Sequence, residues 1–197
     1  PRDEDCITGQ DVAPEEVVAL AAKAGCRTVA HTYTEPTIYF EYAYDIARQA
    51  GRAGLKNIFV TNGYMTEEAL RTLHPHLHGA NVDLKAFREE FYRKRCGAGL
   101  DGVLRSLRVM KELGVWVEIT TLIIPGLNDS EEELRDLARF IVSLGKEVPW
   151  HISRFHPMYK MLDRSPTSVK ILARARKIGM DAGLRYVYTG NVPGDPG

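Results

Sequence analysis

Short apolar runs along this chain alternate with longer segments in which apolar residues recur at helical spacing. Most of the runs follow a glycine, as in Ala53-Gly54-Leu55 and Leu113-Gly114-Val115, and glycine suits the left-handed residue that ends a helix. The pattern predicts six strands, over residues 27–34, 57–62, 80–85, 115–124, 149–155 and 184–189. It predicts helices over 14–24, 37–50, 66–73, 100–113, 130–144 and 166–182, with a further helical turn near 88–95.

The repeat of helix, glycine and strand is typical of an α/β fold. The distance between successive glycines suits a βα unit with its loops, and right-handed crossovers stack such strands in parallel. Helix starts agree with this reading, since Thr66 precedes two acids and Ser130-x-x-Glu133 has the spacing of a capping box. No linker rich in Pro, Gly or Ser divides residues 1–197, so we expect a single domain.

Charge and composition exclude several classes of partner. Lys plus Arg and Asp plus Glu number 26 each, so no overall field favours nucleic acid or an anionic membrane. The apolar runs are strand-sized and shorter than a membrane-spanning helix requires. Three scattered cysteines, at positions 6, 26 and 96, make no disulfide framework. We therefore expect a cytoplasmic protein that binds neither nucleic acid nor membrane.

The stretch Arg27 to Pro36 places a carboxylate close to a strand end. An apolar, β-branched run opens it, Glu35 lies near its end, and Pro36 cannot continue strand pairing because it lacks an N–H. We expect a buried strand that delivers Glu35 to a sheet edge, followed at once by a helix. In α/β sheets ligands bind at such junctions.

Asn81-Val-Asp-Leu-Lys85 alternates polar and apolar residues, although a parallel strand normally has both faces buried. The polar face carries Asn81, Asp83 and Lys85, and Leu84 faces the other way. This face must pair internally or line a ligand site, because unpaired buried polar groups are costly. The plainer alternative is an Asp83–Lys85 ion pair at a solvated strand end.

Other polar residues give weaker signals. Glu118 and Thr120 share a face of the next strand, where Glu118 could simply pair with an arginine, and Thr61-Asn62-Gly63 is ordinary turn chemistry. His156 precedes Pro157 and is expected at a strand end, with a hydrogen-bonded loop histidine as the alternative. The alternating histidines and the scattered cysteines predict no metal site: His74, His76, His78, Cys6, Cys26, Cys96.

Six motifs in register resemble one family: Tyr33-Thr-Glu-Pro36, Val60-Thr-Asn-Gly63, Asn81-Val-Asp-Leu-Lys85, Leu122-Ile-Ile-Pro-Gly-Leu-Asn-Asp129, Pro149-Trp-His-Ile-Ser-Arg-Phe-His-Pro157 and Tyr186-Val-Tyr-Thr-Gly-Asn-Val-Pro193. The chain resembles radical S-adenosylmethionine (SAM) enzymes of the pyruvate formate-lyase activating type, and among them the radical SAM member of the AmmeMemoRadiSam system. The resemblance implies a partial (βα)₆ TIM-like barrel with parallel strands, whose strand ends hold a [4Fe–4S] cluster and SAM.

Carried over by position, the resemblance implies cofactor-binding roles for Glu35, Asn62, Asp83, Lys85, Thr120 and His156. Glu35 matches the acid of a Gly-Gly-Glu motif that receives the SAM amino group, and Val60 stands where relatives have a metal-binding Asp. The family's Cys-x₃-Cys-x₂-Cys is absent, so the cluster ligands and a first strand are expected upstream of Pro1. A further cysteine-bearing stretch is expected after Gly197.

The activity that the resemblance implies is reductive cleavage of SAM to a 5′-deoxyadenosyl radical that abstracts hydrogen from a substrate, with a glycyl-radical protein as one candidate. Flavodoxin or ferredoxin would supply the electron. A Schiff-base aldolase or lyase using Lys85, with Asp83 or Glu118 carrying the proton, is the alternative enzyme. A non-catalytic barrel fragment that binds a partner is the third reading.

Overall fold

The structure, a computed structural model, describes residues 10–192 and 194. Its centre is a six-stranded parallel sheet in which neighbours in sequence are neighbours in space, in the order β1 to β6. The strands are β1 (Thr28–His31), β2 (Lys56–Thr61), β3 (Gly79–Asp83), β4 (Trp116–Ile123), β5 (Trp150–Arg154) and β6 (Val187–Gly190). The predicted α/β fold is confirmed.

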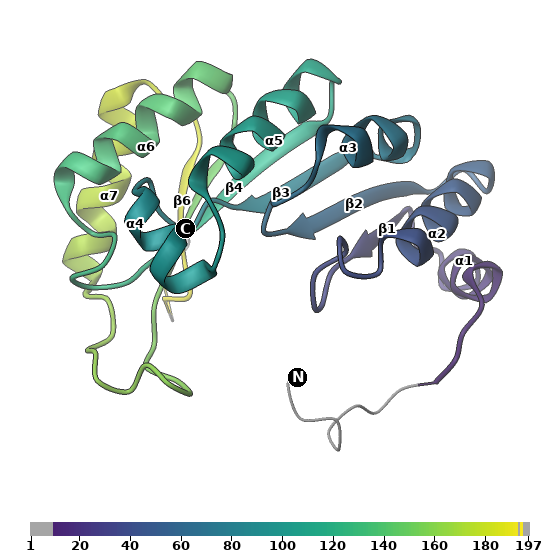
Figure 1. Cartoon of the computed structure of the whole chain (residues 1–197), viewed down its shortest axis with the longest axis horizontal. Helices are drawn as coiled ribbons and strands as arrows, with labels where there is room; N and C mark the ends of the chain where they lie inside the picture. The colour runs from purple at the N-terminus through teal and green to yellow at the C-terminus, as the bar shows by residue number, and fades with distance from the viewer. Residues whose placement is uncertain (1–9, 193, 195–197) are drawn as a thin grey trace.

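Helices connect the strands along one side of the curved sheet (Figure 1). The main helices are α1 (Pro14–Lys23), α2 (Phe40–Arg52), α3 (Glu67–Leu73), α5 (Leu100–Glu112), α6 (Glu131–Leu144) and α7 (Val169–Ala182). Short turns are η2 (His74–His76), α4 (Glu89–Phe91) and the π-helical η3 (Tyr92–Cys96). The last two confirm the helical turn predicted after the third strand.

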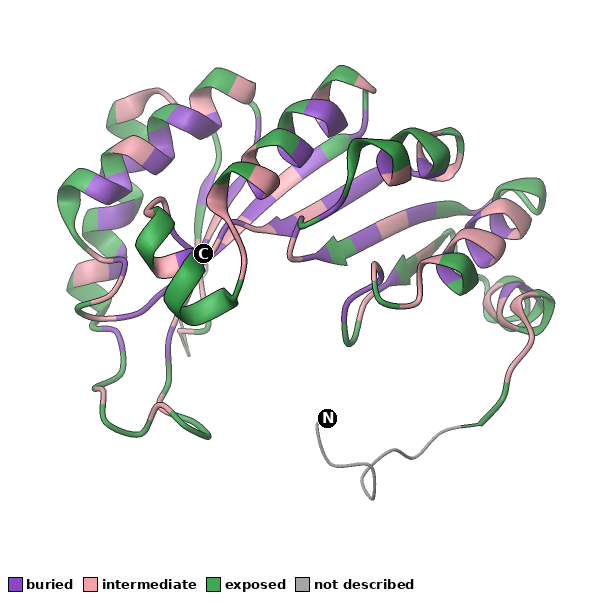
Figure 2. Ribbon diagram, in the orientation of Figure 1, coloured by how far each residue is buried: buried purple, intermediate pink, exposed green. Residues whose placement is uncertain are grey.

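The core lies between the sheet and these helices, and buried positions face each other across that layer (Figure 2). Phe59, Leu84 and Trp150 are fully buried there. The indole N–H of Trp150 donates to the hydroxyl of Thr121 at 3.0 Å, so the largest core side chain keeps its polar atom paired. Leu84 faces the helices, as alternation along β3 predicts.

Several predicted boundaries were wrong. The strand predicted at 27–34 is only partly buried and ends at His31, and α2 begins at Phe40 rather than at residue 37. The loop between them folds back so that Glu35 contacts the end of β2. Helix α7 starts at Val169 rather than 166, because the Ser168 hydroxyl accepts a hydrogen bond from the Ile171 N–H and caps it there.

The predicted capping box of α6 is half formed. Ser130 accepts from the Glu133 N–H at 3.3 Å, as predicted. The Glu133 side chain does not complete the box; it is 4% exposed, and its Oε1 accepts from the Phe87 N–H at 2.7 Å. The carboxylate therefore fastens the segment after β3 to α6.

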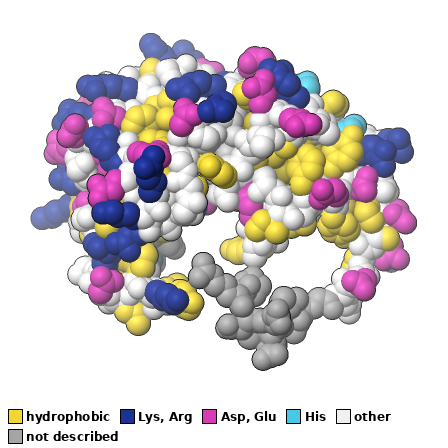
Figure 3. Space-filling model, viewed as in Figure 1, with side chains coloured by type: hydrophobic (Ala, Val, Ile, Leu, Met, Phe, Trp, Pro, Cys, Tyr) yellow, Lys and Arg dark blue, Asp and Glu magenta, His cyan; other side chains and the backbone are white. Residues whose placement is uncertain are grey.

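The other side of the sheet is polar along its middle strands. Asn81, Glu118, Thr120, His151 and Ser153 are all half-buried and alternate with fully buried neighbours. The whole molecule is hollowed below the sheet in the space-filling view (Figure 3). The carboxyl ends of the strands and the polar face of the sheet thus meet at one concave region.

Candidate functional site

Glu35 is the most constrained carboxylate of this region. It is 8% exposed. Its Oε1 accepts from the Thr61 hydroxyl at 2.6 Å and from the hydroxyl and N–H of Thr37 at 3.0 and 3.3 Å. Its Oε2 accepts from the Asn62 N–H at 2.7 Å. Since a carboxylate oxygen can accept two hydrogen bonds, Oε2 keeps one acceptor direction for a ligand.

Asp83 and Lys85 form an ion pair at the end of β3. Lys85 Nζ lies 2.9 Å from Asp83 Oδ2, and each side chain is 41% exposed. The Asp83–Lys85 ion pair, which the sequence analysis gave as the alternative to a ligand site, is therefore present. An ammonium has three N–H donors, and Asp83 takes one of them, so the lysine can still bind a ligand.

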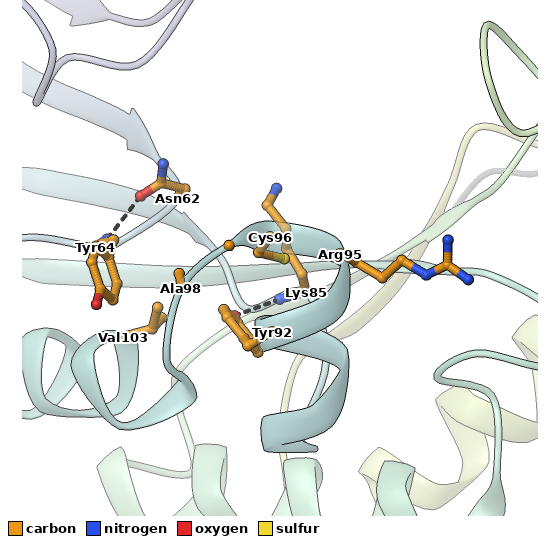
Figure 4. A pocket seen from close by; sticks show the side chains of 9 residues that line it. Asn62, Tyr64, Lys85, Tyr92, Arg95, Cys96, Ala98 and Val103 are labelled. Carbon is orange, nitrogen blue, oxygen red and sulfur yellow. Dashed lines mark hydrogen bonds between the residues drawn. The ribbon is translucent and has the colours of Figure 1, made fainter.

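Tyr92 fixes the backbone beside that pair. Its hydroxyl accepts from the Lys85 N–H at 3.1 Å (Figure 4). Tyr92 is 2% exposed, and burial raises the pKa of its phenol well above the usual value. It therefore stays a neutral hydroxyl that holds the start of the loop after β3.

Three cavities meet at Lys85. One of about 370 Å³ reaches toward β1 and β2 and is lined by Glu35, Val60, Asn62, Asp83 and Lys85, among others. A second of about 180 Å³ reaches toward β4 and β5, past Thr120 and Ser153. A third of about 350 Å³ lies under the turn that contains Tyr92 and Cys96 (Figure 4). Lys85 is thus the shared wall of three adjoining spaces.

One register row crosses the polar face of the sheet. Asp83 pairs with Thr120, Thr120 with His151, and His151 with Tyr188. Their side chains share one level, with neighbouring strands spaced about 4.8 Å apart. The His151 ring stacks on that of Tyr188, with 5.4 Å between centroids.

Glu118 pairs with a histidine rather than with the arginine considered from the sequence. His151 Nε2 lies 2.8 Å from Glu118 Oε2, and the indole N–H of Trp116 donates to Oε1 at 3.1 Å. Sequence reasoning missed this pair because its members are 33 positions apart. Only the strand register brings them together.

Three more predicted residues have defined places. Asn62 lines two of the cavities and accepts from the Tyr64 N–H at 2.8 Å. Thr120 lines the smallest one and donates to Asn81 Oδ1 at 2.8 Å. His156 is exposed, its ring lies 3.4 Å from the Asn191 carbonyl, and it lines none of the three cavities. The structure therefore unites all the predicted site residues except His156.

The three alternating histidines do not form a metal site. His78 Nδ1 accepts from the Asn57 N–H at 3.1 Å, which gives it a structural role. Within residues 10–192 and 194, no three His, Cys, Asp or Glu side chains come together to hold a metal ion. Cys6 lies outside the described residues, whereas Cys26 and Cys96 are free thiols. Cluster ligation cannot be assigned to the part of the chain that the structure describes.

A parallel α/β sheet with carboxylates and a lysine at its strand ends has the usual place of a ligand site in such folds. The sequence profile of the Radical SAM superfamily matches residues 2–141, and the chain belongs to that superfamily. The resemblance found in the sequence motifs is thereby confirmed. Membership implies SAM and a [4Fe–4S] cluster as cofactors.

Relatives support the same family with different degrees of similarity. Uncharacterized protein MJ0808 of Methanocaldococcus jannaschii is 42% identical over 194 residues, which are 98% of this chain and 57% of that protein. The isethionate sulfite-lyase activating enzyme of Oleidesulfovibrio alaskensis is 26% identical over 136 residues, covering 66% of this chain and 43% of that enzyme. The chain thus spans about half the length of these curated relatives.

Solved structures share the fold. A domain of pyruvate-formate lyase-activating enzyme from Bacteroides vulgatus superposes with a TM-score of 0.73 at 20% identity, over 83% of this chain and 98% of that one. Streptococcus suis SuiB bound to S-adenosylmethionine gives 0.75 at 13% identity, over 95% of this chain and 46% of SuiB. The predicted radical SAM partial-barrel architecture agrees with both. In the described residues no helix is both long and apolar enough to span a membrane.

Proposed function

We propose that this chain binds SAM along the carboxyl ends of β1 to β5, with its methionine part in the 370 Å³ cavity and its adenosine part toward the 180 Å³ cavity. The two cavities share Asp83 and Lys85 and together form a continuous row along the strand ends. An elongated ligand with a charged end suits that shape.

The charges of the larger cavity match the methionine part. The free acceptor direction of Glu35 Oε2 suits the ammonium, and the two remaining donors of Lys85 suit the carboxylate. Charge-assisted hydrogen bonds of this kind are stronger than neutral ones. The observation that carries the proposal is that Glu35 and Lys85 line one cavity. The two residues have opposite charges, and each keeps hydrogen-bonding capacity for a ligand.

On the adenosine side, polar groups alternate with apolar walls. Asp83, Thr120 and Ser153 can bond ribose hydroxyls, and Leu122 and Ile124 offer apolar contact for the base. His156 keeps its proposed role in adenosine binding only if its exposed ring moves inward. We therefore place His156 outside the residues that contact SAM directly.

A bound [4Fe–4S] cluster would supply the electron that cleaves SAM and so yields a 5′-deoxyadenosyl radical for hydrogen abstraction. We propose that its ligands lie outside the described residues. The chain's own residues bind SAM and keep its methionine and adenosine parts in a fixed direction along the sheet. Glycyl-radical activation is a narrower hypothesis, supported by the names of relatives such as the isethionate sulfite-lyase activating enzyme.

Lysine-dependent Schiff-base chemistry is less well supported. It needs a neutral amine, usually produced by desolvation. Lys85 is instead 41% exposed and paired with Asp83, so the desolvated environment that this chemistry needs is missing there.

The direct test of the proposed function is anaerobic incubation of the cluster-loaded protein with SAM and dithionite, followed by chromatography for 5′-deoxyadenosine. We expect 5′-deoxyadenosine and methionine in equal amounts, and neither without reductant. A protein that holds its full cluster, binds SAM and forms no 5′-deoxyadenosine would contradict the assigned chemistry.

A further inference from the structure

The Glu118–His151 pair lies on the polar side of the sheet, opposite the helices. Trp116, Glu118 and Thr120 alternate with buried residues along β4, and His151 does so along β5, so the four side chains share this concave face. The side chains of Glu118 and His151 are each 35% exposed. Neither residue lines any of the three cavities around Lys85. The proposed SAM site therefore gives this pair no role.

Glu118 fixes the protonation of the His151 ring. His151 Nε2 lies 2.8 Å from Glu118 Oε2, and a carboxylate only accepts hydrogen bonds, so Nε2 carries the hydrogen. Glu118 Oε1 accepts from the indole N–H of Trp116 at 3.1 Å, which holds the carboxylate in place. In a neutral imidazole only one nitrogen carries a hydrogen. Nδ1 of neutral His151 is therefore a hydrogen-bond acceptor.

This acceptor is unpaired and open to solvent. No group among the described residues donates to His151 Nδ1. In this part of the chain, the side-chain atoms enclosed without a partner are Arg48 Nε and His74 Nδ1, so Nδ1 of His151 is not enclosed. The neighbouring Thr120 hydroxyl already donates to Asn81 Oδ1 at 2.8 Å. An oriented acceptor is thus available on the concave face.

Two aromatic side chains flank the Glu118–His151 pair. The Tyr188 ring stacks on that of His151, with 5.4 Å between centroids, and Trp116 bonds Glu118 on the other side. Tyr188 is 41% exposed and Trp116 is 51% exposed. Exposed aromatic rings beside an oriented polar atom suit a ligand that has both a ring and a polar group.

The strand register brings this position close to the proposed SAM site. His151 pairs with Thr120, which lines the 180 Å³ cavity assigned to adenosine. Neighbouring strands lie about 4.8 Å apart. Ser153, two residues further along β5, lines the same cavity. A ligand on His151 would therefore lie beside the adenosine part of SAM, where the proposed reaction forms its radical.

We propose that the concave face binds a small molecule with a planar ring and an O–H or N–H group, which donates to His151 Nδ1. The ring lies against Trp116 and Tyr188. Glu118 is a positioning residue that acts through Nε2. That this molecule is the substrate of the radical reaction rests on the proposed function, whereas the binding site itself does not. Such a substrate differs from the protein that glycyl-radical activation would require.

The tautomer of His151 is the first measurement. Proton–nitrogen correlation NMR of the full chain, with nitrogen-15-labelled histidine, is recorded at about pH 8, above the ordinary histidine pKa. The His151 signals are those missing from His151→Phe. We expect a hydrogen on Nε2 and none on Nδ1. A hydrogen on Nδ1 would overturn the proposal, because that nitrogen could not accept one from a ligand.

The second measurement compares two ligands that differ in one donor. p-Cresol joins a ring to a hydroxyl, and in 4-methylanisole a methyl group replaces the hydroxyl hydrogen. The dissociation constant of each for the full chain, without SAM, is obtained from broadening of its ring-methyl NMR signal. The ratio of the two constants, 4-methylanisole over p-cresol, is the preference for the donor. No binding of p-cresol up to its solubility limit would overturn the proposal.

His151→Phe should lower this preference about twofold to tenfold, the loss of one hydrogen bond, while keeping a ring against Tyr188. His156→Phe is the matched control and should leave the preference unchanged, since His156 is bonded only to the Asn191 carbonyl within the described residues. The same preference in wild type and His151→Phe, in protein whose melting curve shows it folded, would refute the assigned acceptor.

Two variants test the positioning role of Glu118. Glu118→Ala should lower the preference, whereas Glu118→Gln should keep most of it, because its amide oxygen still accepts from Nε2. An undiminished preference in Glu118→Ala would refute that role. A calorimetric SAM titration of the cluster-loaded wild type is read separately. Absence of SAM binding, with the donor preference as expected, would refute only the proposed function and leave the ligand site in place.

Discussion

Glu35 Oε2 accepts a 2.7 Å hydrogen bond from the backbone N–H of Asn62, so the loop after β1 is fastened to the end of β2. Four donors converge on this one carboxylate. The wall of the proposed methionine cavity is therefore held in place before any ligand arrives. Such preorganisation lowers the cost of ordering the site on binding.

Replacing Glu35 should weaken both the fold and the site. Glu35→Ala leaves the Asn62 N–H and the Thr61 hydroxyl without their acceptor, and hydrogen bonds to charged groups contribute about 1.5–3 kcal/mol. We expect a loss of that size in unfolding free energy, measured by urea titration, and weaker SAM binding in calorimetry. Glu41→Ala, on the exposed face of α2, should change the unfolding free energy by less than about 0.5 kcal/mol. Equal effects of the two variants would refute the role of Glu35.

Tyr92 offers a test of how the loop after β3 is held. Tyr92→Phe removes the acceptor of the Lys85 N–H and should lower unfolding free energy by about 1–3 kcal/mol. Tyr64→Phe is the matched control, because Tyr64 is 52% exposed and its hydroxyl has no hydrogen bond within the described residues. Thermal melts of both variants test this expectation. If Tyr64→Phe loses as much stability as Tyr92→Phe, the hydrogen bond from the Lys85 N–H does not contribute to the stability of the fold.

Glu133 should give stability a specific pH dependence. Burial raises its pKa above the ordinary value, while the Phe87 N–H and Arg88 oppose that rise. The folded protein therefore binds this proton more tightly than the unfolded chain does. Its contribution to stability falls as pH rises from about 4, near the unfolded pKa of Glu, through the raised folded value.

Glu133→Gln should remove this dependence and still offer an oxygen to the Phe87 N–H. The stability difference between wild type and Glu133→Gln, from urea titrations at several pH values, should drift against the wild type as pH rises through that window. A difference that is flat with pH, or that drifts in favour of the wild type, would show that the pKa of Glu133 is not raised.

The fold could be predicted largely from local signals. Glycines such as Gly54 and Gly114 end helices in the left-handed conformation, with φ of 77° and 76°, and the strands follow where the apolar runs predicted them. The end of β3 and the two residues after it also show two faces directly, since Leu84 is buried while Asp83 and Lys85 are half-exposed. The two-residue period of a strand is enough to predict which of these side chains are buried and which are exposed.

Contacts between distant segments could not be predicted. The return of Glu35 to β2, the use of Glu133 to bind the Phe87 N–H, and the Glu118–His151 pair all join residues that only the folded sheet brings together. Sequence spacing carries no information on such partners. The position of His156 outside the three cavities could not be predicted either, because a place next to Pro157 indicates where a strand ends and not where the ring points.

The contrast between two adjacent residues that directly follow β3 tests the central claim that Lys85 binds the SAM carboxylate. Lys85→Met should raise the dissociation constant for SAM by about tenfold to a hundredfold, the equivalent of roughly 1.5–3 kcal/mol for a lost charge-assisted bond. Leu84→Ala, which opens a space in the fully buried core, should instead lower unfolding free energy by about 2–5 kcal/mol and leave SAM affinity nearly intact.

The deciding measurement is a calorimetric SAM titration of cluster-loaded wild type, Lys85→Met and Leu84→Ala at a temperature where all three are folded. We expect weakened SAM binding for Lys85→Met alone. Unchanged affinity in Lys85→Met would mean that Lys85 serves only its 2.9 Å ion pair with Asp83, and the proposed SAM site would be wrong.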